Sequence, residues 1–187
     1  MGTLSVAFGS QQASSFTVDS DTQITAISPT GAGTVAVAVT TPGGISPASG
    51  ADQFIYVPMP TVTSIAPALG PATGGTQVTI LGSNLSRVTA VSFGSTPSAT
   101  VSVGSDTQLS AIAPAGTGAV DITVGSPGGT SATSAADQFT YIASPTATSI
   151  SPTSGPLSGG TVVTVHGTNF TAATAVALGA KQQPVSA

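Results

Sequence analysis

The hexapeptide ADQFIY, at residues 51–56, returns 85 residues later as ADQFTY, at residues 136–141. The loop sequence GPATGGT, at residues 70–76, likewise returns as GPLSGGT, at residues 155–161. A fixed period of this length exceeds that of solenoid repeats, so it predicts a row of small domains.

The phase of the repeat divides the chain into three parts. Residues 60–144 form one complete unit, residues 1–59 correspond to the later part of a unit, and residues 145–187 to its opening part. Neither partial unit should be stable alone, because each would expose an apolar face and unpaired strand edges. We therefore expect one complete domain between two partial ones.

Short alternating segments fill the complete unit, and turn residues separate them. They predict seven strands, at residues 61–66, 76–81, 88–93, 99–103, 108–113, 120–124 and 139–141. Helical periodicity is absent. Seven short strands in a unit of this length predict an all-β fold of tandem immunoglobulin-like β-sandwiches.

The alternation along these strands also assigns side chains to the core, since successive residues point to opposite faces. We expect the following residues to face inward: Val78, Ile80, Phe93, Ile112, Ile122 and Phe139.

The composition excludes several classes of protein. Only 4% of the residues are charged and the mean hydropathy is +0.40, which argues against disorder. The two basic residues, Arg87 and Lys181, are too few for a nucleic-acid partner. No apolar stretch approaches the roughly 18 residues of a membrane span. Cysteine is absent, so we expect no disulfide, thiol nucleophile or thiolate metal site.

Two longer patterns carry a resemblance to a known family. Residues 60–85 and 145–170 share P-x-[VA]-T-S-I-x-P-x-x-G-P-x-[TS]-G-G-T-x-V-T-[IV]-x-G-[ST]-N-[LF]. Residues 20–35 and 105–120 share S-D-T-Q-[IL]-x-A-I-x-P-x-G-x-G-x-V. These patterns resemble the opening and the end of an IPT/TIG domain.

The resemblance implies an early-type (E-set) immunoglobulin sandwich without a disulfide. It leaves function open, because such modules serve as DNA-binding dimer domains, receptor spacers, enzyme-appended modules and bacterial surface repeats. The charge-poor, Ser/Thr/Gly-rich style is most similar to the bacterial extracellular members, so we expect an extracellular or cell-surface location. No leader segment is visible in the sequence given.

Candidate chemical groups are few. His166 is the sole histidine and has no second His, Cys or Glu as partner, so we interpret it as an exposed strand residue. Asp19 and Asp21 are a close acidic pair, but the next unit has Gly104 in place of the first acid. A turn is the better interpretation of that pair than a calcium site.

Turn geometry also accounts for other polar residues. Asp52 and Asp137 precede the last strand of their units and indicate turns at the start of that strand. Asn84 and Asn169 each begin an N-x-[ST] pattern; either a glycan site or an asparagine in a left-handed turn would explain them.

Core packing is a better interpretation of the aromatic residues than a flat sugar-binding platform. The chain has no Trp, and Tyr56 and Tyr141 alternate with Phe54 and Phe139, which indicates core packing. The sequence therefore predicts no catalytic, cofactor or metal site.

The function that fits best is a non-catalytic extracellular structural or adhesion scaffold. Linkers of a few residues, at 57–60 and 142–145, suit a semi-rigid spacer. Two alternatives stay open, namely a fragment of a longer cell-surface array and an accessory module of a polysaccharide-active enzyme. A glycan or receptor partner is not identified.

The partial units suggest that the chain is its own partner. Strands 146–151 and 161–166 of one copy would complete residues 4–56 of the next, and repetition would build a head-to-tail filament. Val163 and Val165 would then take the places of Val78 and Ile80. One copy of the third strand, which both partial units supply, would have to be displaced. Completion of the two partial units within one molecule is disfavoured, because the middle domain separates them. The alternative that the chain is cut from a longer array, with frayed ends, is still possible.

Overall fold

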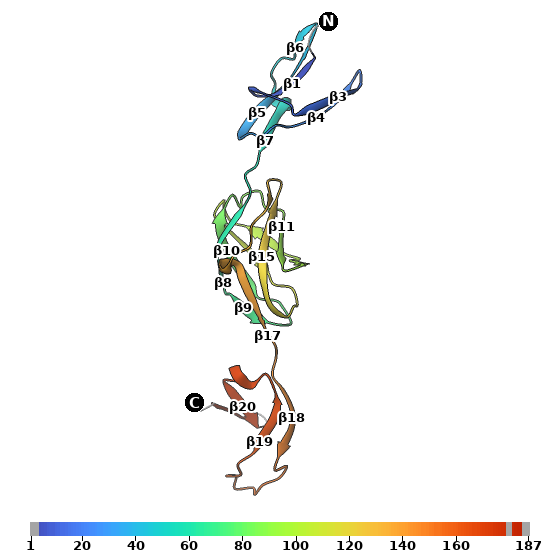
Figure 1. The fold of residues 1–187 in the computed structure, drawn as a ribbon. Coiled ribbons are helices and arrows are strands. Elements are labelled where there is room, and N and C mark those ends of the chain that lie inside the picture. The colour runs from blue at the N-terminus through green and yellow to red at the C-terminus, as the bar shows by residue number, and fades with distance from the viewer. Residues whose placement is uncertain (1–3, 179–180, 185–187) are drawn as a thin grey trace.

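The computed structural model describes residues 4–178 and 181–184 of the chain. In these residues the regular structure consists of β-strands and three single-turn 3₁₀-helices. Figure 1 shows three units that follow one another along an elongated molecule. The predicted all-β fold class is therefore confirmed.

The middle unit is a sandwich of two sheets. One has the strand order β13-β14-β10-β8, and the other β12-β11-β15-β17-β9, with β16 paired to β15. Neighbouring strands are antiparallel except β17 and β9, which are parallel. The bounds are β8 Thr61–Ala66, β9 Leu69–Pro71, β10 Gln77–Ser83, β11 Ala90–Phe93, β12 Thr96–Pro97, β13 Val101–Val103, β14 Gln108–Ile112, β15 Gly118–Ser126, β16 Gly129–Thr130, η2 Ala135–Asp137 and β17 Gln138–Ile142.

The core of the middle unit lies between these sheets. Five residues expected in the core are buried, with at most 2% of their surface exposed; they are Val78, Ile80, Phe93, Ile122 and Phe139. The Phe139 ring packs edge-on against Phe93 and Tyr141, at centroid distances of 5.4 and 5.1 Å. Such edge-to-face pairs add to the stabilisation that burial itself provides.

The expectation for Ile112 is wrong, because Ile112 lies on the outer side of its strand and is only partly buried. The register of β10 and β14 places Ala111 opposite Val78 and Leu109 opposite Ile80. Directly opposed residues share a face of the sheet, so Ala111, which is 1% exposed, faces inward instead.

The first unit contains the later strands of the same sandwich. Its larger sheet has the order β2-β1-β5-β6 with β7 also paired to β5, and β3 and β4 form a separate hairpin. The bounds are β1 Ser5–Phe8, β2 Gln11–Gln12, β3 Ser15–Ser20, β4 Gln23–Ile27, β5 Gly33–Thr41, β6 Gly44–Ile45, η1 Gly50–Asp52 and β7 Gln53–Tyr56. No strand within residues 4–56 corresponds to β8, β9 or β10. Phe54 is consequently 37% exposed, whereas its counterpart Phe139 is 0% exposed.

The third unit contains the opening strands, arranged as two hairpins, β18 with β19 and β20 with β21. The bounds are β18 Thr146–Ser151, β19 Thr164–Thr168, η3 Phe170–Ala172, β20 Ala175–Leu178 and β21 Lys181–Pro184.

The expected strand at residues 161–166 therefore begins later than predicted, at Thr164. The middle unit explains the delay. Gln77 and Val78, at the start of β10, pair with β14 alone, since β8 pairs with β10 only from Thr79 onward. The described part of the third unit has no β14 counterpart, so Val162 and Val163 have no ladder partner there.

Replacement of Phe139 by Ala should lower the free energy of unfolding of the middle unit by about 3–5 kcal/mol, because it removes a fully buried ring. Urea unfolding followed by circular dichroism measures this change. The matched variant Phe54→Ala should cost less in the monomeric chain, because Phe54 is already partly exposed. A negligible change in the free energy of unfolding for both variants would contradict the assignment of Phe139 to the core.

Candidate functional site

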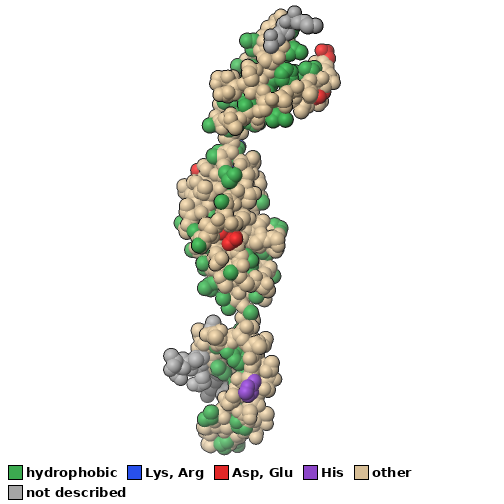
Figure 2. All heavy atoms as spheres, in the orientation of Figure 1, with side chains coloured by type: hydrophobic (Ala, Val, Ile, Leu, Met, Phe, Trp, Pro, Cys, Tyr) green, Lys and Arg blue, Asp and Glu red, His purple; other side chains and the backbone are tan. Residues whose placement is uncertain are grey.

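Groups suited to catalysis or metal binding do not gather in the described residues. His166 is exposed on β19, and no three of the described His, Asp or Glu side chains are placed to hold a metal ion. Figure 2 shows acidic side chains only in isolated places on the face it presents. No helix found in residues 4–178 and 181–184 has the length and apolar character needed to cross a membrane.

Four of the six acidic residues accept hydrogen bonds in local turns; they are Asp19, Asp52, Asp106 and Asp137. Asp19 accepts hydrogen bonds from the Thr25 hydroxyl (2.6 Å), the Thr17 hydroxyl (3.1 Å) and the Gln23 amide (3.2 Å). Thr25, then Thr17, hold the pKa of the Asp19 carboxyl below its ordinary value, because their bonds stabilise the charged form. Asp21 is exposed and does not join this cluster.

Asp52 and Asp137 each close a capping box at a 3₁₀ turn before the last strand. The Ser49 N–H donates to Asp52 Oδ2, and the Ser134 N–H donates to Asp137 Oδ2, both over 2.7 Å. Asp137 is fully buried, whereas Asp52 is only partly buried. The packing of η2 against β8 accounts for this difference, because the first unit has no β8 counterpart among its described residues.

Asn84 and Asn169 occupy left-handed turns, with φ angles of 58° and 61°. Asn84 Nδ2 donates to the Met59 carbonyl, and Asn169 Nδ2 donates to the Ser144 carbonyl, both over 3.0 Å. The sequence analysis identified the turns but missed these contacts with the preceding linker. Their only sequence signal is that the two asparagines of the chain recur at the repeat offset.

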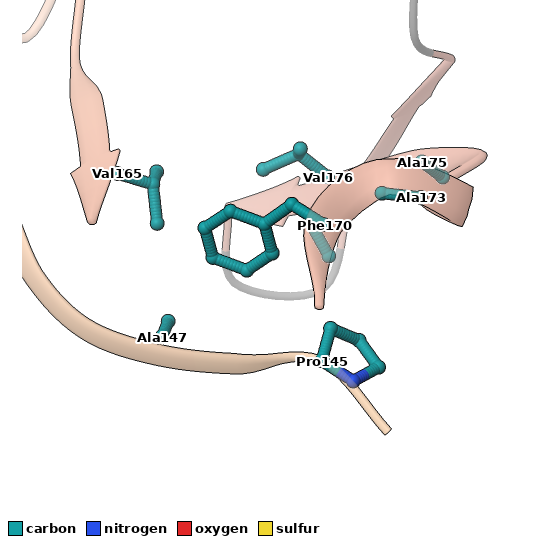
Figure 3. Close-up of a pocket in the computed structure, with 8 residues that line it drawn as sticks. Pro145, Ala147, Val165, Phe170, Ala173, Ala175 and Val176 are labelled. Carbon is teal, nitrogen blue, oxygen red and sulfur yellow. The ribbon is translucent and has the colours of Figure 1, made fainter. Parts of the chain in front are cut away.

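The third unit has an open apolar cavity of about 450 Å³. Figure 3 shows Phe170 at its centre, with Val165 and Val176 from two strands and Ala147 and Pro145 along the opposite side. These side chains form the inner face of a half-sandwich. In the middle unit the counterparts of Phe170, Val165 and Val176 are Leu85, Ile80 and Val91, which are buried.

The first unit has a corresponding opening of about 500 Å³. Leu4, Val18, Ile24 and Val39 line it with polar residues of the β3–β4 turn. Leu4 and Val18 are about half exposed. Two of the lining residues, Ile24 and Val39, hold the places of Leu109 and Val124, which the middle unit buries, whereas the counterparts of Leu4 and Val18 are exposed there as well. The first unit therefore leaves part of its apolar inner surface uncovered.

The backbone edges of the partial units are open as well. In the middle unit β10 lies between β8 and β14. In the described parts of the flanking units, β4 pairs with β3 alone and β19 with β18 alone. The edge of β4 therefore lacks a β10-type neighbour, and the edge of β19 lacks a β14-type neighbour.

A model of the family described as "IPT/TIG domain" matches residues 60–141 and 145–186. The chain is 34% identical over 128 residues to Plexin-A3 of Rattus norvegicus and 32% identical over 128 residues to Plexin-A3 of Homo sapiens. Each match covers 63% of this chain and 7% of the plexin.

A solved structure of the full extracellular region of Plexin A4 matches 79% of this chain and 13% of the plexin chain. The sequence identity is 23% and the TM-score is 0.52, so this likeness concerns the fold alone.

Asp106 provides a test of the turn that follows β10. The Ser86 hydroxyl and N–H donate to Asp106 Oδ1 over 2.8 and 3.3 Å. These bonds hold the pKa of Asp106 below its ordinary value, and the bond from the hydroxyl has the larger effect. The charged Asp106 therefore stabilises the folded unit at pH values above its unfolded-state pKa of about 4. This contribution is lost as the pH falls through the lower folded-state pKa.

Replacement of Ser86 by Ala should raise the pKa of Asp106 toward the ordinary value, because the shorter bond disappears. A carbon-13 NMR titration of the carboxyl group measures it. Ser105→Ala is the matched control, since the Ser105 hydroxyl bonds to Thr107 and should leave the titration of Asp106 in place. An unchanged pKa in Ser86→Ala would contradict the assigned cause.

Proposed function

Because this chain belongs to the IPT/TIG domain family, we propose that it is a non-catalytic extracellular scaffold whose immunoglobulin-like units hold neighbouring parts at a set spacing. The observation that carries this proposal is the tight connection between units. Strand β7 ends at Tyr56 and β8 begins at Thr61, while β17 ends at Ile142 and β18 begins at Thr146. Connections this short and proline-containing restrict the swing of one domain against another.

Contacts with the middle unit shorten the free part of the first linker further. Pro60 is fully buried. Gly128 lies so close to the carbonyl groups of Val57 and Pro58 that a Cβ atom there would overlap them. The linker therefore runs against the surface of the middle unit.

The finer part of the proposal is that the scaffold assembles head to tail. Strands β18 and β19 of one copy would complete the first unit of the next copy, with β19 added to the open edge of β4. Strand addition of this kind combines main-chain hydrogen bonds with side-chain pockets. The open edges and apolar cavities of the two partial units support it, and the middle unit supplies the template.

The template specifies a register. The β10–β14 pairs Ile80–Leu109 and Val78–Ala111 become, at the same repeat positions, Val165 opposite Ile24 and Val163 opposite Ala26. All four template residues are buried. Each new pair would thus bring together two apolar side chains on the inner face.

Both partial units supply the third strand, as β1 and as β20. Strand β1 is paired with β5 along its whole length, Ser5–Phe8, whereas β20 pairs only with β21 among the described residues. In the proposed assembly the β20–β21 hairpin is therefore the copy that moves aside.

Replacement of both Val163 and Val165 by Asp should abolish assembly and leave the middle unit folded, because it places two charges on the inner face. Light scattering and electron microscopy at high concentration follow assembly, and circular dichroism follows folding. Assembly of the unmodified chain should resist salt, since it depends on apolar burial rather than on charge. Val162→Asp is the control, because Val162 is 87% exposed and should tolerate the charge.

An engineered cross-link tests the register directly. The chain has no cysteine, so Thr25→Cys with Thr164→Cys introduces a single pair at the positions of Ser110 and Thr79, which oppose each other. Directly opposed strand residues have Cα atoms about 4.5–5.5 Å apart, within the range of a disulfide. Oxidation should therefore give a ladder of covalent oligomers on a non-reducing gel.

The control pair is Gln23→Cys with Thr164→Cys, which is displaced by two residues along the same face and should cross-link poorly. Equal cross-linking of both pairs would contradict the register, and an unmodified chain that stays monomeric would contradict assembly.

The two alternatives give different results. A segment of a longer surface array would have the same open edges filled by adjoining residues of its own chain, and residues 1–187 would stay monomeric. An accessory module of a polysaccharide-active enzyme would bind glycans, which calorimetry with soluble polysaccharides would detect. The edge-to-face packing of Tyr56 on Phe54, at a centroid distance of 4.9 Å, favours a packing role for that aromatic residue.

A further inference from the structure

We infer that Asn84 and Asn169 are clasps by which each unit holds the linker that leads into it, and that these clasps limit the swing between successive units. The inference rests on the proposed scaffold function and assigns its stiffness to particular side chains. It depends on contacts within the chain and not on assembly.

The position of each asparagine requires two properties at once. Its backbone lies in the left-handed region, which Gly, Asn and Asp tolerate best. Its side chain must also donate a hydrogen bond to a carbonyl oxygen of the linker, at Met59 or Ser144. Glycine has no side chain to donate, and an aspartate carboxylate only accepts, so asparagine alone of the three meets both requirements.

Further contacts hold the start of the following strand beside each asparagine. The Thr61 and Ser83 hydroxyls are 2.8 Å apart, and the Thr146 and Thr168 hydroxyls are 2.6 Å apart. Thr63 donates to the Leu81 carbonyl over 3.1 Å.

Glycines at equivalent positions complete this arrangement. Gly82 lies against the Thr61 carbonyl, and Gly167 against the Thr146 carbonyl, so closely that a Cβ atom at either would overlap it. The first strand after each linker, β8 or β18, therefore packs closely against the strand that ends just before the asparagine, β10 or β19.

The clasp forms equally in a complete and in a partial sandwich. In the third unit it involves β18, β19, the turn after β19 and the residue just before Pro145, without the second half of a sandwich in the described residues. Two instances with the same bond length and the same backbone conformation make it a property of the repeat. The same contacts explain the asparagine of the N-x-[ST] pattern without a glycan.

The clasp acts on the swing because it anchors the linker at Met59. With Met59 held, only Val57 and Pro58 lie between the end of β7 and the held segment. Val57 and Pro58 also lie against Gly128, and Pro60 is buried, so release of Met59 would remove the hydrogen bond that holds the centre of this linker. A linker with one anchor fewer reaches a wider range of end positions, so the spread of distances between the two units should rise.

Pulsed electron–electron resonance between two spin labels measures that spread. The variant Gln11→Cys with Thr96→Cys places one label on exposed β2 of the first unit and one on exposed β12 of the middle unit. The labelled chain is diluted with unlabelled chain so that only distances within one molecule are recorded. Asn84→Asp and Asn84→Gly should each broaden the distance distribution, because each removes the hydrogen bond to the Met59 carbonyl.

Two variants keep the test sound if one of them unfolds, and circular dichroism establishes that the middle unit stays folded. Asn169→Gly is the matched control, since it releases the other linker and should leave this distribution unchanged. A narrow distribution that neither Asn84 variant broadens would overturn the clasp and leave the scaffold function standing. A broad distribution already present in the unmodified chain would overturn both.

Discussion

The burial of Phe139 between two sheets is the interaction on which the rest of the structure depends. Its ring is covered only when β8 and β10 form the opposite sheet and β9 lies beside β17, so the sandwich cannot be divided without exposing it. Phe54 shows the result of such a division, because the same residue at the same position is 37% exposed when the covering strands are missing from the described unit. Both the apolar cavities and the open strand edges follow from this one requirement.

Clusters of chemically reactive side chains are not found among the residues that the structure describes. Most of the chain's acidic groups accept hydrogen bonds in local turns, and six of its aromatic rings pack edge-on in two clusters. What distinguishes the chain is the way its units are joined. Short linkers, a buried Pro60 and the asparagine contacts all fix the position of the chain where it passes from one unit to the next. These features control the spacing between units and do not provide groups for catalysis or ligand binding.

Much of the fold could be predicted from the sequence because strand alternation is a local pattern. The 85-residue repeat and the short alternating segments were sufficient for the fold class and for most inward positions. The error at Ile112 arose because alternation alone does not say which of two faces is buried, and a large apolar residue was preferred to Ala111. The late start of β19 and the Asn84 contact depend on partners distant in sequence, which no local pattern reveals.

The placement of the clasp has a consequence for how such a chain can grow. Each clasp lies wholly within one unit and the few residues that lead into it. A domain and the linker that precedes it are therefore encoded by one continuous stretch of the gene. Duplication of one repeat in the gene adds a domain together with a working joint, and neighbouring domains need no compensating change. The length of the molecule can thus change in whole steps of one unit while each new joint has the same asparagine contact.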